Sequence, residues 1–223
     1  LDAGSGGGHF SQAAHARGAR VVSLDVGTDL LTQVRRRCPR CRPVAGNVRR
    51  LPFPARSFDV VICTEVIEHT ISPEQAICEL SRVVADDGLL VLTVPCLTWQ
   101  PVVRLATALK LRPYNGHENF VSFSALQRIV NACELTVEWA GGFNFCPIFS
   151  SRLDPLFRWF DATLGRRAPW LMVNLAIRAR RLPTSASPPG DAPQRPEEKA
   201  FPLAAVPPAT AGPPSASPPG VHD

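Results

Sequence analysis

The sequence predicts an α/β fold in which helices cover a doubly wound, mostly parallel sheet. Three observations support this prediction. Apolar, β-rich runs alternate with amphipathic helical patterns up to about residue 182, a glycine-rich loop stands at 1–9, and the run FDVVICT at 58–64 is almost wholly apolar. Strands that alternate with helices form parallel sheets, and a strand inside such a sheet is apolar on both faces.

The loop at 1–9, LDAGSGGGH, indicates a nucleotide-type binding edge. Glycine adopts positive φ readily and has no Cβ, so a ligand can approach the backbone closely. A dinucleotide fingerprint requires a third glycine at the position of His9, which disfavours an NAD site. The spacing is instead G-x-G-x-G behind an acidic residue, formed by Asp2, Gly4, Gly6 and Gly8.

The next two elements place an acid beside this loop. Residues 10–17 are expected to form a helix that ends at Gly18, a residue suited to a left-handed cap. The run RVVSLD at 20–25 is expected as the second strand. Asp25, at its end, is placed to accept hydrogen bonds from both ribose hydroxyls of a nucleoside cofactor. An alternative stays open, in which Asp25 is an acid ahead of the following helix.

Capping signals define the elements that follow. Ser72 is a candidate N-cap with Pro73 at the first helical position, and the acids and glycine at 86–88 are expected to end that helix. The expected elements are strands at 43–46 and 58–64, a helix from 73 to about 85, and a strand at 89–94.

The stretch GNVRRLPFPARSFDVVICTEVIEHT at 46–70 makes the pattern specific. Together with the glycine loop, its order and spacing resemble the class I S-adenosylmethionine-dependent methyltransferases, and among them the small-molecule family that includes quinone-ring methylases. The resemblance runs from Leu1 to about Leu135. It implies a Rossmann-like, doubly wound, mostly parallel seven-stranded sheet with an antiparallel last strand, and S-adenosylmethionine as the cofactor.

The resemblance also implies which residues bind the cofactor. The position of Asn47 is often Asp in the family and accepts a hydrogen bond from the adenine amino group, while the next backbone amide meets a ring nitrogen. Asn47 departs from that pattern but keeps an acceptor oxygen. Thr64 and Glu65 would lie near the methionine part. The expected cofactor-binding set is Asp2, Gly4, Gly6, Gly8, Asp25, Asn47, Val48, Thr64 and Glu65.

Methyl transfer requires alignment of the acceptor with the methyl group, and an O- or N-acceptor also needs a base. His69 and His117 are the imidazoles expected near the pocket, although each also suits a structural role. Glu65, Glu68 and His69 resemble a cluster that is linked to a metal ion in some quinone methylases. The same cluster is the family's ordinary strand-to-helix junction, so we expect no metal.

The C-terminal half is expected to supply the acceptor site and close the sheet. Residues 96–123 are interpreted as a substrate-facing insertion. A helix opened by Ser124 should follow, then a strand at 135–140, a helix at 153–164 and a closing strand at 171–181. The basic, amphipathic helix at 153–164 is expected to pack its apolar stripe on the sheet, with contact to lipid as the alternative.

The predicted function is transfer of a methyl group from S-adenosylmethionine to a small-molecule acceptor. One alternative is a non-catalytic cofactor-binding or scaffold protein. Another is an NAD-dependent oxidoreductase, disfavoured by His9 and by the lack of a Tyr-x-x-x-Lys pair. The acceptor itself is set by the insertion loops and not by the scaffold.

Charge, hydropathy and cysteine usage bound the partners and the compartment. The formal net charge is +5, with arginines scattered along the chain, so no nucleic-acid partner is expected. No stretch approaches the roughly 18 apolar residues of a membrane span. The seven cysteines lie mostly in apolar runs and are expected to be buried free thiols, which suggests a cytoplasmic protein. The single C-P-R-C at 38–41 is too little for a zinc site.

The chain divides into two expected regions. Residues 1–182 are interpreted as a methyltransferase domain, and 183–223 as a disordered tail that holds more than half of the 23 prolines. Only three residues precede the glycines, against about five or six in an ordinary strand. We therefore expect that an N-terminal part of the domain, with the rest of the first strand, is missing.

Deletion of residues 183–223 is expected to leave the melting temperature and methyl transfer nearly unchanged, because so proline-rich a segment cannot bury enough apolar surface to order itself. A thermal melt of the shortened chain beside the full chain tests this. A drop of several degrees would show that the tail packs on the domain.

Overall fold

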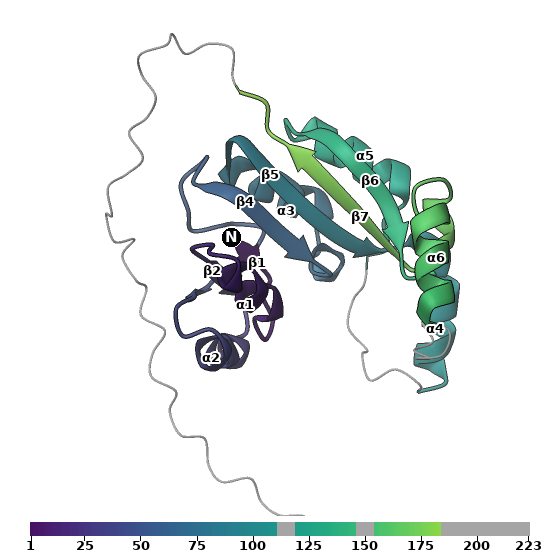
Figure 1. The fold of residues 1–223 in the computed structure, drawn as a ribbon, viewed down its shortest axis with the longest axis horizontal. Coiled ribbons are helices and arrows are strands. Elements are labelled where there is room, and N and C mark those ends of the chain that lie inside the picture. The colour runs from purple at the N-terminus through teal and green to yellow at the C-terminus, as the bar shows by residue number, and fades with distance from the viewer. Residues whose placement is uncertain (111–118, 146–153, 184–223) are drawn as a thin grey trace, which may run out of the picture.

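The computed structural model describes residues 1–110, 119–145 and 154–183, and within them seven strands form one sheet (Figure 1). The strand order is β3-β2-β1-β4-β5-β7-β6. Neighbours from β3 to β5 pair in parallel, whereas β7 runs antiparallel to both β5 and β6. The predicted fold class is thus confirmed. The strands are β1 (Asp2–Ala3), β2 (Val22–Asp25), β3 (Arg42–Ala45), β4 (Phe58–Thr64), β5 (Val84–Pro95), β6 (Thr136–Phe143) and β7 (Asn174–Arg180).

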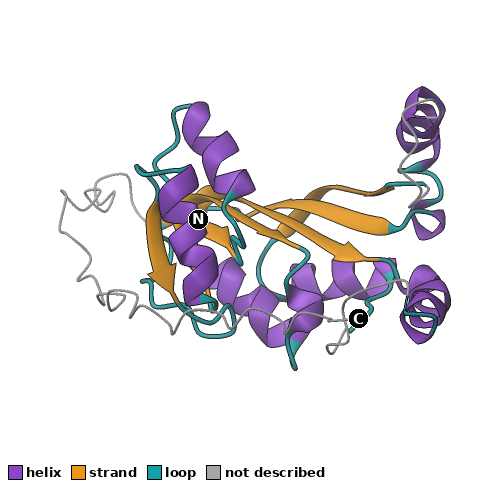
Figure 2. Cartoon of the chain, turned by 90° about the horizontal axis from the view of Figure 1, so that it is seen from below, coloured by secondary structure: helices purple, strands orange, loops and turns teal. Residues whose placement is uncertain are grey.

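Helices lie on both faces of the sheet, as Figure 2 shows. The α-helices are α1 (His9–Ala16), α2 (Thr28–Arg37), α3 (Pro73–Val83), α4 (Gln100–Ala108), α5 (Phe123–Ala132) and α6 (Asp154–Leu164). Three short 3-10 helices are η1 (Ile67–His69), η2 (Leu97–Trp99) and η3 (Pro169–Leu171). Among the described helices, none is both long and apolar enough to cross a bilayer.

The strand order places the loops after β1 and β4 side by side. The chain proceeds from β1 outward through β2 to β3, and then returns to β4 on the other side of β1. At such a reversal the connections that follow two adjacent parallel strands run to opposite faces of the sheet. This leaves a crevice for a ligand at the carboxyl ends of the two strands. Here Gly4 follows β1 and meets Val66 of the loop after β4.

The core fills both sides of the central strands. Leu24, Val61, Ile77, Leu92 and Ile177 are at most 1% exposed and belong to one cluster that joins the sheet to the helices. The sheet is therefore held by packing along its whole width.

The prediction that β4 is buried on both faces is only partly correct. β4 does lie between β1 and β5, as expected. Val61 and Cys63 are fully buried, whereas Val60 is 42% exposed. The first half of the strand therefore has one open face.

Several predicted boundaries shift by a few residues, and the acids and glycine at 86–88, predicted to end a helix, lie inside β5. Helix α3 has the predicted Ser72 cap, whose Oγ accepts a hydrogen bond from the Gln75 amide, but it ends at Val83, and Val84 already pairs with Phe58 in the sheet. Helix α5 is capped by Ser122 and not by Ser124, because Ser122 has the extended backbone that a cap requires. The last strand begins at Asn174, since the 3-10 helix η3 takes up the residues before it.

Four of the cysteines expected as free thiols form disulfides instead. Cys38 pairs with Cys41, and Cys78 pairs with Cys133. The second pair joins residues 55 apart in sequence, and only the packing of α3 against α5 brings them together. Cys63 and Cys96 are buried free thiols as predicted, and Cys146 lies outside the described residues.

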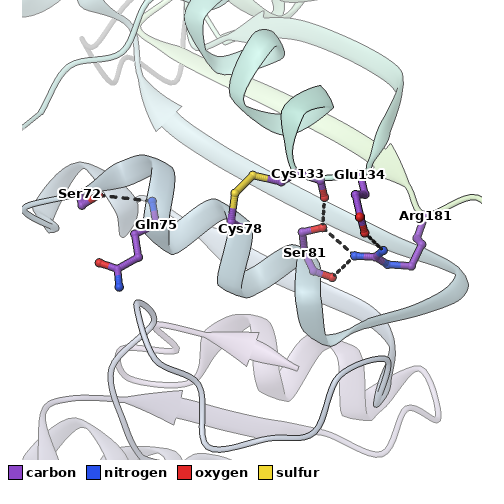
Figure 3. The surroundings of a disulfide bond; sticks show 7 residues. All are labelled: Ser72, Gln75, Cys78, Ser81, Cys133, Glu134 and Arg181. Atoms are coloured by element: carbon purple, nitrogen blue, oxygen red, sulfur yellow. Dashed lines mark hydrogen bonds and ion pairs between the residues drawn. A yellow bond between two sulfur atoms is a disulfide. The ribbon is translucent and has the colours of Figure 1, made fainter.

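A buried arginine ties the same helices to the sheet beside this disulfide (Figure 3). The guanidinium of Arg181, which is 6% exposed, donates to the Ser81 carbonyl oxygen at 2.8 Å and to Glu134 Oε2 at 3.0 Å. The Ser81 hydroxyl in turn donates to the Cys133 carbonyl oxygen. Polar contacts therefore join α3, α5 and the end of β7 independently of the sulfur bond.

Candidate cofactor site

The glycine loop has a conformation that glycine favours. Gly4, Gly6 and Gly8 have φ values of 76°, 50° and 80°, in the left-handed region. A Cβ on Gly4 would lie 2.3 Å from Val66 Cγ2, so this glycine allows the loops after β1 and β4 to approach each other. A Cβ on Gly6 would meet nothing within 4 Å. The loop is thus packed against Val66 at Gly4, whereas the space beside Gly6 is free of protein atoms.

The carboxylate of Asp25 is fixed against this loop. Its Oδ2 accepts a hydrogen bond from the Gly6 amide at 2.9 Å, and its Oδ1 accepts one from the Gly27 amide at 2.9 Å. Each carboxylate oxygen can accept a second hydrogen bond, so both retain capacity for a ligand hydroxyl. The structure therefore brings Asp25 to the loop, where the sequence predicted a ribose acceptor.

Asp2 lies beneath the loop in a buried hydrogen-bonded chain. Its Oδ2 accepts from Ser11 Oγ at 2.6 Å, and Ser11 Oγ lies 2.7 Å from Ser23 Oγ. Burial raises the pKa of the Asp2 carboxyl, while the hydrogen bond from Ser11 opposes that shift. These contacts join β1, α1 and β2 under the glycines. The two serines were missed because neither belongs to a motif, and their only sequence signal is a polar residue in an otherwise apolar strand or helix face.

Asn47 lies just beyond β3 and its side chain closes a turn. Asn47 Oδ1 accepts a hydrogen bond from the Arg49 amide at 2.9 Å, and the next residue, Val48, is buried. The Gly46 amide donates to the backbone carbonyl of Asp25 at 3.0 Å, which holds this turn near the end of β2. An amide oxygen has two lone pairs, so Asn47 keeps one for a further donor.

Replacement of Asn47 by Asp is expected to keep or improve S-adenosylmethionine binding. The contact with the Arg49 amide and the proposed contact with the adenine amino group both use an acceptor oxygen, which the carboxylate retains. The amide donor of Asn47 is therefore not needed. Calorimetric titration of the variant checks this, with Asn47→Ala as the matched loss of the acceptor. Weaker binding by Asn47→Asp than by the parent chain would mean that the amide donates, and the adenine contact would need reassignment.

The Glu65 side chain contacts residues of two other strands, β5 and β7, at the end of the sheet where the parallel strands have their carboxyl ends. We call this end the open edge of the sheet. It follows Thr64 and has a φ of 54°, which is uncommon for a residue with a side chain and which recurs at functional sites. Its Oε1 accepts from Thr93 Oγ1 at 2.7 Å, and its Oε2 accepts from Asn174 Nδ2 at 2.8 Å. Asn144 Nδ2 donates to Asn174 Oδ1 at 3.1 Å. Sequence reasoning missed both asparagines, because Asn174 meets Glu65, and Asn144 meets Asn174, only after β6 and β7 join the sheet.

Of the two histidines predicted to act as bases, the structure describes His69. His69 lies in η1, with Nε2 3.6 Å from Oε1 of the buried Glu68. The Asn119 amide donates to the Glu68 carbonyl oxygen at 2.7 Å, so the end of the predicted insertion does return to this junction. His117 lies outside the described residues. Within the residues described, no three His, Cys, Asp or Glu side chains gather in a way that could hold a metal ion.

Two surface hollows of the described residues lie elsewhere. One of about 440 Å³ is lined by Arg49, Arg50, Gln75, Cys78, Glu79 and Arg82, and one of about 360 Å³ lies between α1 and the residues that follow α2. Neither is lined by the glycines, Asp25 or Glu65. The candidate site is therefore located by the topology and by the unused acceptors of Asp25, and not by these two hollows.

The sequence is similar to known methyltransferases over part of its length. Residues 1–92 match the family described as "Methyltransferase domain". A probable S-adenosylmethionine-dependent methyltransferase of Mycobacterium tuberculosis is 33% identical over 95 residues, which are 43% of this chain and 35% of that protein. A ubiquinone biosynthesis O-methyltransferase of Hahella chejuensis is 29% identical over 160 residues, covering 66% of this chain and 67% of that protein.

The fold comparison agrees over a larger part of the chain. The crystal structure of an S-adenosylmethionine-dependent methyltransferase from Mesorhizobium loti has a TM-score of 0.61 at 18% identity. The alignment covers 81% of this chain and 89% of that structure. At this identity the likeness establishes the fold alone.

Proposed function

We propose that this chain, whose residues 1–92 match the family described as "Methyltransferase domain", is a class I S-adenosylmethionine-dependent methyltransferase that transfers a methyl group from S-adenosylmethionine to a small-molecule acceptor. The observation that supports this most directly is the Asp25 carboxylate, fixed by the Gly6 amide at the point where the strand order reverses. There it offers two acceptor oxygens to the ribose hydroxyls of the cofactor.

The residues of the glycine loop fit such a cofactor. Gly6 leaves the backbone open to close approach, and the Ser5 hydroxyl is buried with no hydrogen-bond partner among the residues described. A buried polar group without a partner is costly, and a polar ligand against the loop would satisfy it. Asp2 acts as a positioning residue, because it fixes α1 and β2 beneath the loop.

The bound cofactor supplies an electrophilic methyl group, so the chain itself needs to align an acceptor and exclude water. We propose that Glu65, held by Thr93 and Asn174, orients groups at the open edge of the sheet. For an oxygen or nitrogen acceptor, His69 and His117 are the proposed proton acceptors. The residues between β5 and α5 and between β6 and β7 would then shape the acceptor site.

The acceptor class is proposed from the relatives. The Hahella chejuensis protein is named a ubiquinone biosynthesis O-methyltransferase, and a Serratia marcescens relative is named a malonyl-[acyl-carrier protein] O-methyltransferase. Both names specify methyl transfer to oxygen. An acceptor oxygen on a small organic molecule or on a carried acyl group is accordingly the first choice to test.

The test combines binding with turnover. Calorimetry is run with S-adenosylmethionine and with NAD, and the chain is then incubated with methyl-labelled S-adenosylmethionine and a metabolite extract. We expect binding of S-adenosylmethionine alone, and a labelled small molecule formed together with equimolar S-adenosylhomocysteine. Binding without turnover would support the scaffold alternative, and binding of NAD alone would support the oxidoreductase alternative.

A cytoplasmic location is a further proposal, and the cysteine pairs test it. Cytosolic thiols are kept reduced, so Cys78 and Cys133 would then be thiols in the cell, whereas a Cys78–Cys133 disulfide that is present in the cell would indicate an oxidising compartment. Alkylation of the protein in freshly lysed cells distinguishes the reduced cysteines from the disulfide. Cys78, which is exposed, would be labelled at once in the reduced protein and protected in the oxidised one.

A further inference from the structure

Helix α4 has almost no cover within the described part of the chain. None of its residues is buried. Val102, Leu105 and Leu109 are 51%, 61% and 59% exposed, and their spacing of three and four residues puts them on one face. A helix of nine residues is marginal in water by itself, and most helical stability comes from packing of an apolar face. We therefore expect another apolar surface to pack against this face of α4.

A second apolar face stands at the same end of the molecule. On α6, Leu156 is 48% exposed and Trp159 is 58% exposed, and on η3, Trp170 is 54% exposed. The apolar stripe of α6, which includes Leu156 and Phe160, was predicted to pack on the sheet. That prediction is only partly correct, because α6 contacts β6 and Phe160 stacks on Phe145, whereas Leu156 stays exposed.

Both faces belong to the open edge of the sheet. α4 follows the end of β5, whereas α6 and η3 lie between the end of β6 and the start of β7. Trp99 Nε1 of η2 donates to the Leu171 carbonyl oxygen of η3 at 3.2 Å, which holds the bases of the two arms together. Figures 1 and 2 both show α4 and α6 beyond the strand ends. We call residues 97–110, which hold η2 and α4, and residues 154–172, which hold α6 and η3, the two apolar arms.

The arms carry a net positive charge. Their acids are Asp154 and Asp161, and Asp161 Oδ1 accepts a hydrogen bond from the Phe145 amide at 2.8 Å. The basic residues of the two arms are Arg104, Lys110, Arg158, Arg166 and Arg167, and all are exposed.

We propose that the two apolar arms dock this protein on the surface of an anionic lipid bilayer. Exposed leucines and tryptophans beside cations are the composition that inserts shallowly into the boundary between headgroups and acyl chains. Tryptophan favours this boundary because one end of its ring system is apolar and the other is polar. A second copy of the chain would instead set cations against cations across a two-fold interface. The docking depends on neither cofactor binding nor methyl transfer.

The test uses the full chain and sedimentation with lipid vesicles. We expect binding to vesicles that contain phosphatidylglycerol, and binding at least about tenfold weaker to vesicles of phosphatidylcholine alone, because the cations contribute only at an anionic surface. Added salt should weaken the binding. The tryptophan fluorescence should shift to the blue on anionic vesicles as the exposed rings leave water.

The matched variants are Leu105→Asp combined with Trp159→Asp, and Leu182→Asp as the control. Leu182 is also 59% exposed but follows β7, at the opposite edge of the sheet. The double variant should lose at least about tenfold in vesicle affinity at an unchanged melting temperature, and the control should bind like the parent chain.

Three results would overturn the proposal. The first is absence of binding to anionic vesicles. The second is equal binding by the parent chain and the folded double variant. The third is a dimer in light scattering that the double variant abolishes, since a second copy would then be the occupant of the arms. Each readout is independent of turnover, so none of them tests the proposed methyl transfer.

Discussion

Replacement of Asp25 by alanine is expected to weaken S-adenosylmethionine binding by about 2 to 4 kcal/mol, or about 30- to 900-fold. The proposed ribose hydroxyls donate to a carboxylate, and hydrogen bonds to charged groups contribute more than neutral ones. The same carboxylate also holds the Gly6 and Gly27 amides, so the substitution removes both the ligand contact and a support of the loop. Calorimetric titration measures the loss.

Asp29→Ala is the matched control for this variant. Asp29 is an exposed acid in the first turn of α2, four residues from Asp25, and its loss removes a similar charge without touching the loop. It should bind the cofactor within about twofold of the parent chain, as surface substitutions usually have small effects. Unchanged affinity in Asp25→Ala, with a normal melting temperature, would rule out Asp25 as the ribose acceptor.

Replacement of Cys78 by serine is expected to lower the free energy of unfolding by about 2 to 4 kcal/mol. The Cys78–Cys133 bond closes a loop across 55 residues, and a crosslink of that length greatly restricts the unfolded chain. For a domain of this size the melting temperature should fall by about 5 to 15 °C. Serine suits the position because Cys78 is exposed, so the substitution leaves no cavity in the core.

Reductant supplies the control for this prediction. The oxidised parent chain should lose about the same stability on addition of a thiol reductant, whereas Cys78→Ser should respond only through Cys38–Cys41, whose three-residue separation restricts the unfolded chain much less. The contacts of Arg181 with Ser81 and Glu134 remain in both cases, so α3 and α5 should stay in place. If the melting temperature of the parent chain did not change on addition of reductant, that result would contradict the disulfide.

Much of the binding edge follows from local sequence. The spacing of Gly4, Gly6 and Gly8 predicts a left-handed, glycine-dependent loop, and the three φ values agree. The run up to Asp25 predicts a strand that ends in an acid, and its carboxylate indeed meets the loop. These features are readable because each depends on residues close in sequence and on the alternation of strands with helices.

The contacts between distant elements were decided by the tertiary structure alone. Nothing near Glu65 in sequence indicates that it meets Asn174, 109 residues away, since that contact requires β7 to insert between β5 and β6. The Cys78–Cys133 pair likewise needs α3 to pack on α5. The apolar pattern that places Leu156 in a stripe could not tell which face of α6 would find a partner. Periodicity specifies that a face is apolar, whereas the residues that cover it come from other parts of the chain, and only packing brings them there.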